Sequence, residues 1–202
     1  MLSVHRYLIL LVICCSTQAS AQRLSSISTR WNDAFVEWDL FTIPPPDPNI
    51  PEDDPEPEPP EETITGELKQ RWLNVRDDWS EWDYQLGEEQ GVIKVKWKDN
   101  PGEWELRSYQ GDIITMRTTF PRNFTEWRVT DNNVSLQLKS KYTTQLDEWL
   151  VNDATDGKFY LYTLRPNDPR DWAIDDQLGP RISQSMKLAL VFLVIINSVP
   201  RI

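Results

Sequence analysis

The sequence predicts a mainly β protein, an antiparallel meander of about six β-hairpin repeats with a 22–23-residue period, curled into a barrel or half-barrel. An apolar C-terminal helix, or a strand, is expected on the concave face of the sheet. Three observations predict this fold: a repeated acid–tryptophan pair, alternating strand-like runs between the pairs, and one continuous apolar run near the C-terminus. Similarity at a fixed period is typical of folds that use one supersecondary unit many times.

The repeat is carried by an acidic residue directly before a tryptophan. The tryptophans of these pairs fall 44, 22, 23, 22 and 23 residues apart, and 44 is two periods of 22. The pairs are Glu37-Trp38, Glu81-Trp82, Glu103-Trp104, Glu126-Trp127, Glu148-Trp149 and Asp171-Trp172. A spacing this regular predicts that each pair occupies the same place in its own structural unit.

The segments around each pair alternate between apolar and polar residues. Ile93–Trp97 and Val134–Tyr142 show this period of two, with many β-branched and aromatic residues, which is the pattern of a half-buried strand. Turn-forming residues such as Asn100-Pro101-Gly102 and Asp131-Asn132-Asn133 mark chain reversals. Each repeat is therefore predicted to be a hairpin, and six hairpins give about twelve strands with one apolar face and one charged face.

An aromatic residue often stands seven positions before the repeat tryptophan, and we expect the two rings to face each other across the turn. These pairs are Trp31/Trp38, Trp97/Trp104, Phe120/Trp127 and Tyr142/Trp149. The second hairpin has three extra residues, with Trp72 and Trp79 ahead of Trp82. This irregularity predicts a β-bulge there.

In repeat length and hairpin form the chain resembles MORN-type repeats, which also build single-layer hairpin meanders. The resemblance does not extend to the regularly placed glycines of those repeats, because the chain has seven glycines and few are in register. It therefore assigns no residue a role.

The C-terminal run Met186–Ile196 is apolar on every side, so it must be buried. Twelve strands about 4.8 Å apart form a sheet roughly 58 Å wide, which one helix about 10 Å thick can cover only if the sheet curls. A barrel of that size leaves room for about one helix inside. A helix is favoured for the run, and its β-branched residues leave an extra central strand as the alternative.

The N-terminus has the pattern of a secretory signal peptide over residues 1–21. Arg6 provides the charge, Tyr7–Cys15 is a short apolar run, and Ala19-Ser20-Ala21 fits a cleavage site, so the mature chain is expected to start at Gln22. Cleavage would remove both cysteines and the only histidine, His5. The mature chain would then have no disulfide, no thiolate or histidine nucleophile and no Cys/His zinc site.

The predicted organisation has one domain after the signal. Residues 22–43 form the first hairpin, residues 44–63 a proline-rich acidic loop, residues 64–181 five further hairpins and residues 182–202 the apolar segment. The stretch Pro44–Glu62 holds nine of the fifteen prolines and eight acidic residues without a basic one, so it is expected to be an extended, solvated spacer. Without Arg6 the chain has 20 basic and 32 acidic residues, a net charge of −12, which disfavours nucleic acid as a partner.

Binding through the acid–tryptophan pairs is the alternative to a purely structural role for them. Tryptophan rings could stack on sugars while the acids bond hydroxyl groups, and two carboxylates on neighbouring hairpins could in principle hydrolyse a glycoside. The weak candidates for such a site are Trp79, Trp104, Trp127, Trp149, Glu103, Glu126 and Glu148. Six equivalent copies favour the structural role, because architecture repeats and a single active site does not.

The favoured interpretation is an exported, non-enzymatic binding or scaffold protein of the periplasm, cell surface or extracellular space. No cofactor and no metal are predicted, since Asn152–Gly157 has the look of a tight turn and lacks the closing Glu of a calcium loop. The partner is not identified by the sequence; an envelope protein or a glycan fits. The alternatives are a carbohydrate-binding β-protein and a small outer-membrane β-barrel, although the strands are shorter than a membrane crossing needs and membrane association is not favoured.

Overall fold

The computed structural model describes residues 23–32, 34–44, 61–73 and 78–199. Within these ranges the chain forms twelve antiparallel strands and one helix. The predicted signal peptide and most of the proline-rich segment Pro44–Glu62 lie outside the described residues.

The strands follow one another as a continuous hairpin meander, in which each strand pairs with its sequence neighbour. Their bounds are β1 (Arg23–Trp31), β2 (Ala34–Ile43), β3 (Thr63–Gln70), β4 (Glu81–Leu86), β5 (Glu89–Trp97), β6 (Asn100–Ser108), β7 (Ile113–Thr118), β8 (Glu126–Thr130), β9 (Ser135–Ser140), β10 (Glu148–Asp153), β11 (Gly157–Arg165) and β12 (Asp168–Leu178).

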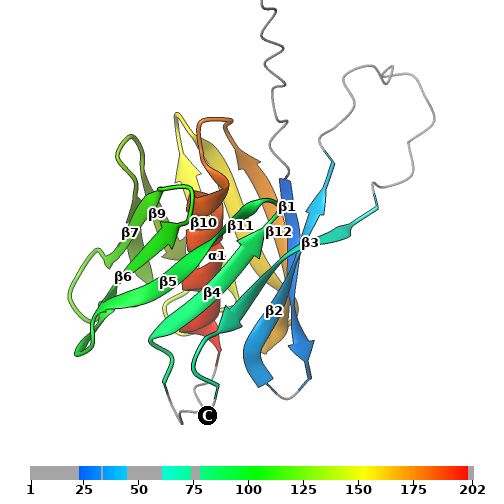
Figure 1. Cartoon of the computed structure of the whole chain (residues 1–202), viewed down its shortest axis with the longest axis horizontal. Helices are drawn as coiled ribbons and strands as arrows, with labels where there is room; N and C mark the ends of the chain where they lie inside the picture. Colours follow the sequence, from blue (N-terminus) through cyan, green and yellow to red (C-terminus); the bar gives the residue numbers. More distant parts are fainter. Residues whose placement is uncertain (1–22, 33, 45–60, 74–77, 200–202) are drawn as a thin grey trace, which may run out of the picture.

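The meander closes into a barrel because β1 pairs with β12, with Ile27 opposite Trp172. The predicted meander is thus confirmed, and the sheet is a closed barrel rather than a half-barrel. Closure leaves none of the twelve described strands with an unpaired edge. Figure 1 shows the strands surrounding the helix.

Helix α1 (Gln184–Ser198) fills the barrel, so the C-terminal run is a helix and not a strand. Ser183 caps its start, where its hydroxyl accepts a hydrogen bond from the Met186 N–H at 3.1 Å. The side chains from Leu188 to Val194 are fully buried against the inner face of the wall. A helix that is apolar on every side suits this place, because the wall surrounds it.

The inner face of each strand carries the apolar half of its alternating pattern. In β6, for example, Trp104 and Leu106 are buried while Arg107 is exposed. The predicted division into an apolar and a charged face is therefore present around the whole barrel, with the apolar face inward.

The second hairpin differs from the prediction of a bulge. Strands β3 and β4 pair from Gly66–Leu86 to Gln70–Trp82 without a register shift. The extra residues lie instead in the connection between the two strands, which includes Trp72 and Trp79. A longer connection accommodates inserted residues without breaking any ladder hydrogen bonds, which explains why the strands stay regular.

Candidate functional site

The six repeat tryptophans are core residues that share one hydrogen bond. Each is the second or the fifth residue of an even-numbered strand, and the exposed fraction of each is 4% or less. The indole N–H of each donates to the backbone carbonyl three residues earlier, at 2.9–3.1 Å. The acceptors are the carbonyls of Phe35, Trp79, Pro101, Phe124, Leu146 and Pro169. This bond satisfies the one polar atom of a buried ring and holds the turn onto the barrel.

Three of the four candidate tryptophans, Trp104, Trp127 and Trp149, therefore face the core and present no ring surface for a sugar. Trp104 makes an edge contact with Phe192 of α1, with ring centroids 5.0 Å apart. Trp79, the fourth candidate, is partly buried and packs against Trp82 at 5.7 Å.

The prediction that an aromatic ring seven positions earlier faces each repeat tryptophan across the turn is wrong. The ring seven positions before the repeat tryptophan lies outside the barrel: Trp31, Trp97, Phe120 and Tyr142 are each 44–58% exposed. Two of these rings follow a register shift in their strands, between Thr29 and Trp31 and between Val95 and Trp97. Because a shift of one residue moves a side chain to the other face, Trp97 leaves the phase of the inward residues Ile93 and Leu106.

The exposed aromatic rings gather at one end of the barrel. Each of the six hairpin ends there contributes at least one large apolar side chain that is 44–60% exposed. We call this set the apolar rim; its members are Trp31, Trp72, Leu73, Trp97, Phe120, Tyr142 and Leu164. The C-terminal end of α1 points to the same end (Figure 1). Seven of the eleven exposed large apolar residues thus lie on one rim. Exposed apolar residues that are scattered singly over a surface are ordinary, whereas a group of them at one place is not.

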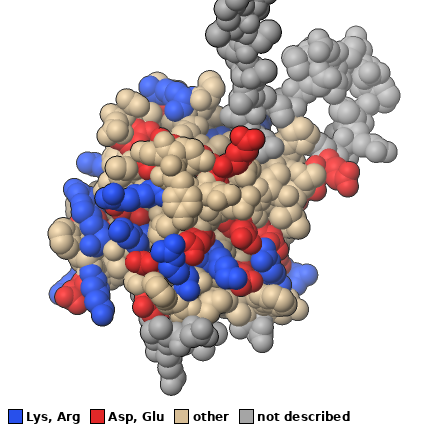
Figure 2. Space-filling view, in the orientation of Figure 1, with Lys and Arg blue, Asp and Glu red and all other residues tan. Residues whose placement is uncertain are grey.

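The acidic residue before each repeat tryptophan points outward and, in four hairpins, faces a basic residue on the next strand. The cross-strand pairs are Glu37–Lys69, Glu81–Lys94, Glu103–Arg117 and Glu126–Lys139. Three of them are ion pairs, at 2.7, 2.8 and 3.3 Å for Glu37, Glu103 and Glu126. Figure 2 shows the result on one face, where basic and acidic side chains lie beside each other over the wall.

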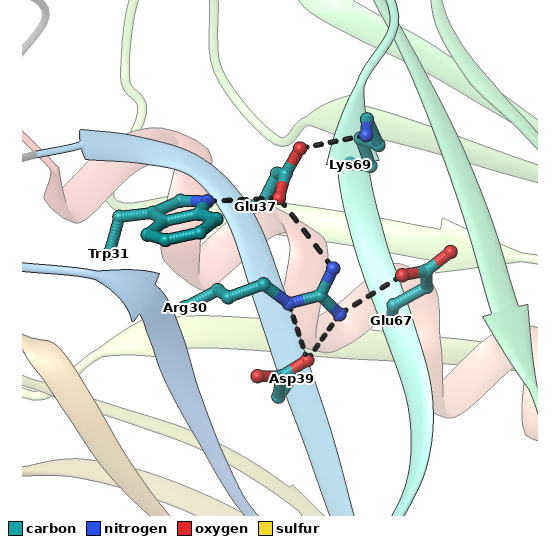
Figure 3. Close-up of polar contacts among 6 residues, drawn as sticks. All are labelled: Arg30, Trp31, Glu37, Asp39, Glu67 and Lys69. Atoms are coloured by element: carbon teal, nitrogen blue, oxygen red, sulfur yellow. Dashed lines mark hydrogen bonds and ion pairs between the residues drawn. The ribbon is translucent and has the colours of Figure 1, made fainter.

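The first hairpin has the densest of these networks (Figure 3). The Arg30 guanidinium lies between Asp39 at 2.5 Å and Glu67 at 3.0 Å. Glu37 accepts from Lys69 at 2.7 Å and from the Trp31 indole at 2.9 Å, and these two hydrogen bonds hold its pKa below the ordinary value. The network joins β1, β2 and β3 from outside.

Two of the three carboxyl groups considered for glycoside hydrolysis, Glu103 and Glu148, have lowered pKa values. Burial raises the pKa of Glu103, but the hydrogen bond from Lys96 and the charge of Arg117 outweigh it, so the net pKa is lowered. Hydrogen bonds from Lys141 and Tyr160 lower the pKa of Glu148. Glu126 pairs with Lys139 and accepts from Gln137. A general acid needs a raised pKa, and neither Glu103 nor Glu148 has one.

The fifth hairpin breaks the outer pattern. Glu148 faces Tyr162 across the strands, where the first four hairpins have a cation. Tyr160 lies two residues away and donates its hydroxyl hydrogen to Glu148, which also pairs with Lys141 at 2.6 Å. The rings of Tyr160 and Tyr162 are 5.3 Å apart. They line a depression of about 250 Å³ together with Asp147, Glu148, Thr163 and Pro166.

Two buried polar clusters hold α1 and were not predicted from the sequence. Lys187 of α1 and Asp176 of β12 form an ion pair at 2.6 Å, with side chains 2% and 0% exposed. Strand alternation could have revealed it, because Asp176 is in phase with the inward Trp172 and Ile174. Near the start of α1, the Tyr84 hydroxyl lies 3.3 Å from the Ser185 hydroxyl, in the second cluster.

Glu89 belongs to this second cluster. Its pKa is raised to about 7, because burial and the nearby charge of Asp112 raise it by more than the hydrogen bonds from Tyr84 and the Ser185 backbone lower it. A carboxyl group beside the N-terminal turn of a helix interacts favourably with the helix dipole. The position of the cluster between β4, β5 and α1 indicates a structural role in seating the helix.

Among the described residues no group of three or more His, Cys, Asp or Glu side chains is arranged to hold a metal ion. In the stretch resembling a calcium loop, Asp153 accepts hydrogen bonds from the backbone of Thr155 and Asp156, as in a tight turn. Asp156 pairs with Arg181. In the described ranges no helix has the length and apolar character to cross a membrane.

Comparisons of the chain with protein-family models, with curated proteins and with solved structures found no significant match.

Proposed function

We propose that this chain is an exported, non-enzymatic binding or scaffold protein of the cell envelope or extracellular space. The observation that carries the proposal is the apolar rim, in which all six hairpin ends at one end of the barrel expose large apolar side chains. Exposed apolar surface of this kind marks a place where a partner binds. Aromatic side chains suit such a surface because they bury a large area with few rotatable bonds.

The filled interior supports an external binding surface. Helix α1 occupies the space that an empty barrel of this kind would offer to a small molecule, and its side chains from Leu188 to Val194 are fully buried. The regular ion pairs on the wall keep its sides polar. A partner that buries apolar area would therefore meet the barrel at its rim.

The non-enzymatic part of the proposal is supported by the state of the candidate acids. Glycoside hydrolysis needs one carboxyl group kept protonated and a second one ionised. Glu103 and Glu148 both have lowered pKa values, and cations lie beside both.

Two alternatives have less support. An outer-membrane barrel needs an apolar band facing outward, whereas the strands here turn their charged residues outward and their apolar residues inward. Carbohydrate binding by the repeat tryptophans would require exposed rings, and Trp104, Trp127 and Trp149 are buried. The burial of these three rings does not bear on carbohydrate binding elsewhere on the barrel, where Tyr162 is exposed.

The export part of the proposal comes from residues 1–21 and is tested separately. The intact mass of the protein recovered from outside the cytoplasm should correspond to a chain that starts at Gln22. A recovered chain that retains Cys14 and Cys15 would contradict the predicted cleavage.

The rim is tested by a triple variant, Trp31→Ser, Trp97→Ser and Phe120→Ser, used as bait in an envelope extract. The matched control changes exposed apolar residues at the opposite end, Tyr109→Ser and Ile113→Ser. We expect wild type and control to retain the same partners and the rim variant to lose them at unchanged melting temperature. Equal retention by all three proteins would overturn the proposal.

A further inference from the structure

The fifth hairpin is where an exposed aromatic ring replaces the cation of the outer pattern. The sixth hairpin also departs from the pattern, because its Asp171 faces Ser28. In the first four hairpins the acid before the tryptophan faces Lys69, Lys94, Arg117 or Lys139. In the fifth the facing residue is Tyr162. A structural repeat gains nothing from this replacement, because it removes the facing cation on the next strand and exposes an aromatic ring, while Glu148 keeps its ion pair with Lys141. Such a local departure from a repeated pattern is expected where a residue serves function.

Tyr160 and Tyr162 together make a stacking surface. They are two residues apart on β11, so both point to the outside of the barrel. Their ring centroids are 5.3 Å apart and their planes differ by 32°, so the two rings pack against each other. We call this pair, with the exposed ring of Tyr162, the platform. Tyr162 is 38% exposed, and its ring is open to the depression of about 250 Å³.

The edge of this platform carries hydrogen-bond acceptors. Glu148 is held in place by Lys141 at 2.6 Å and by the Tyr160 hydroxyl. One oxygen of Asp147 accepts from the Gln145 amide at 2.6 Å, and its other oxygen, Oδ1, is buried without a hydrogen bond from the described residues. The Thr163 N–H donates to the Asp147 carbonyl at 3.0 Å, which anchors the loop to β11.

A second depression of about 250 Å³ adjoins the first. It shares Asp147 and Thr163 with the first and continues past Gln145 and Asn167 toward Ser198 at the end of α1. Asn167 has a positive φ of 61°, a conformation that Asn tolerates. Because the two depressions share part of their lining, we call them together the groove.

We infer that this groove binds a neutral saccharide chain, with one sugar ring on the Tyr160–Tyr162 platform and its hydroxyl groups on Asp147 and Glu148. A pyranose ring has an apolar face that packs on aromatic rings and hydroxyl hydrogens that carboxylates accept. Apolar lining with a few convergent polar groups is the usual make-up of a ligand site. Two carboxylates against the single cation Lys141 disfavour an anionic sugar. The inference rests on the proposed function in one respect, that the barrel is a binding protein.

The test uses defined neutral tetrasaccharides, cellotetraose, maltotetraose and chitotetraose, with tetragalacturonate as the anionic comparison. Binding to the full chain is measured by calorimetry and by saturation-transfer NMR. We expect at least one neutral chain to bind with a Kd of about 1 mM or tighter, and Tyr162→Ala to weaken it about tenfold or more. Asp147→Asn keeps the side-chain shape and is expected to weaken binding as well.

The matched control is Tyr109→Ala, which removes an exposed tyrosine at the opposite end of the barrel. It should bind as wild type does, and the melting temperatures of all variants should agree, which separates loss of binding from loss of fold. The inference is overturned if folded wild type binds none of the neutral chains, if Tyr162→Ala binds equally well, or if tetragalacturonate binds more tightly. Failure here with partner capture still dependent on the rim would leave the proposed function standing. Saccharide binding with no dependence of capture on the rim would support the groove and contradict the rim proposal.

Discussion

On the inner face of the barrel the six hairpins are nearly interchangeable, whereas on the outer face the fifth differs from the first four. Inside, every repeat places a buried tryptophan whose N–H bonds the carbonyl three residues earlier. Outside, the acid beside that tryptophan faces a cation in four hairpins, Tyr162 in the fifth and Ser28 in the sixth. The repeated contacts of the inner face therefore belong to the fold, and the exposed tyrosine of the fifth hairpin is the exception on which the proposed saccharide site rests.

The inner face is uniform because all six repeats meet the same physical demand. A buried indole without a partner for its N–H costs about 1–3 kcal/mol, so each ring needs an acceptor within its own turn. The outer face meets water, where surface ion pairs contribute about 0–1 kcal/mol each and substitutions are tolerated. Variation can therefore accumulate outside without loss of the barrel.

The largest expected effect comes from removing the helix that the inner face surrounds. Truncation after Pro180 would remove α1, which is buried from Met186 to Ile196. The apolar side chains on the inner face of the barrel would then be uncovered. Several hundred Å² of exposed apolar surface drives association. We expect the truncated protein to aggregate and to bind a hydrophobic dye, as measured by light scattering and fluorescence. A truncated chain that stays monomeric and equally stable would show that the helix is not part of the core.

The next largest effect concerns the buried ion pair between the helix and the wall. Lys187→Met leaves Asp176 buried without its cation, and its remaining described hydrogen bonds come from backbone groups of Leu24 and Leu178. Loss of one partner of a buried pair costs about 3–5 kcal/mol, which denaturant unfolding should detect.

The double variant Lys187→Met with Asp176→Asn is the control for this pair. Asn is neutral and its carbonyl can still accept from the Leu24 N–H, so we expect much of the stability to return. A double variant as unstable as Lys187→Met would show that the lysine acts through packing and not through its charge.

A smaller and pH-dependent effect is expected at Glu89, whose pKa is raised by burial to about 7 from an ordinary 4.5. The folded barrel holds this proton more tightly than the unfolded chain, so the stabilisation is complete below about pH 4.5 and is lost as the pH rises through about 7. Glu89→Gln should remove this loss, so the variant should gain melting temperature relative to wild type at pH 8 and not at pH 5. A difference that is the same at both pH values would contradict the role of the buried carboxyl group.

The smallest effect is expected on the outer wall, at the network of the first hairpin. Arg30→Met removes a cation that contacts Glu37, Asp39 and Glu67, but its side chain is 34% exposed and water replaces its contacts. We expect a loss of about 1 kcal/mol or less, decreasing further with added salt. A loss as large as that of Lys187→Met would mean that the outer face holds the barrel as strongly as the inner one.

The fold was predictable because the repeat period of the sequence equals the length of one hairpin. The spacing of the tryptophans gave six hairpins, and the length of the apolar run Met186–Ile196 gave a curled sheet around a helix. The side on which Trp97 lies was not predictable from alternation, because a register shift precedes it. The groove was missed for a related reason: the departure at Tyr162 becomes visible only when the strand register shows what Glu148 faces.

The most direct test of the account compares two tryptophans of one hairpin, Trp104 and Trp97. Trp104 is 4% exposed, bonds the Pro101 carbonyl at 2.9 Å and contacts Phe192 of the helix, whereas Trp97 is 58% exposed. The free energy of unfolding should fall by about 3–5 kcal/mol for Trp104→Ala and by about 0.5 kcal/mol or less for Trp97→Ala. Equal losses in the two variants, or a larger loss for Trp97→Ala, would contradict the division of the repeat into an inner face that holds the barrel together and an outer face that contributes little to its stability.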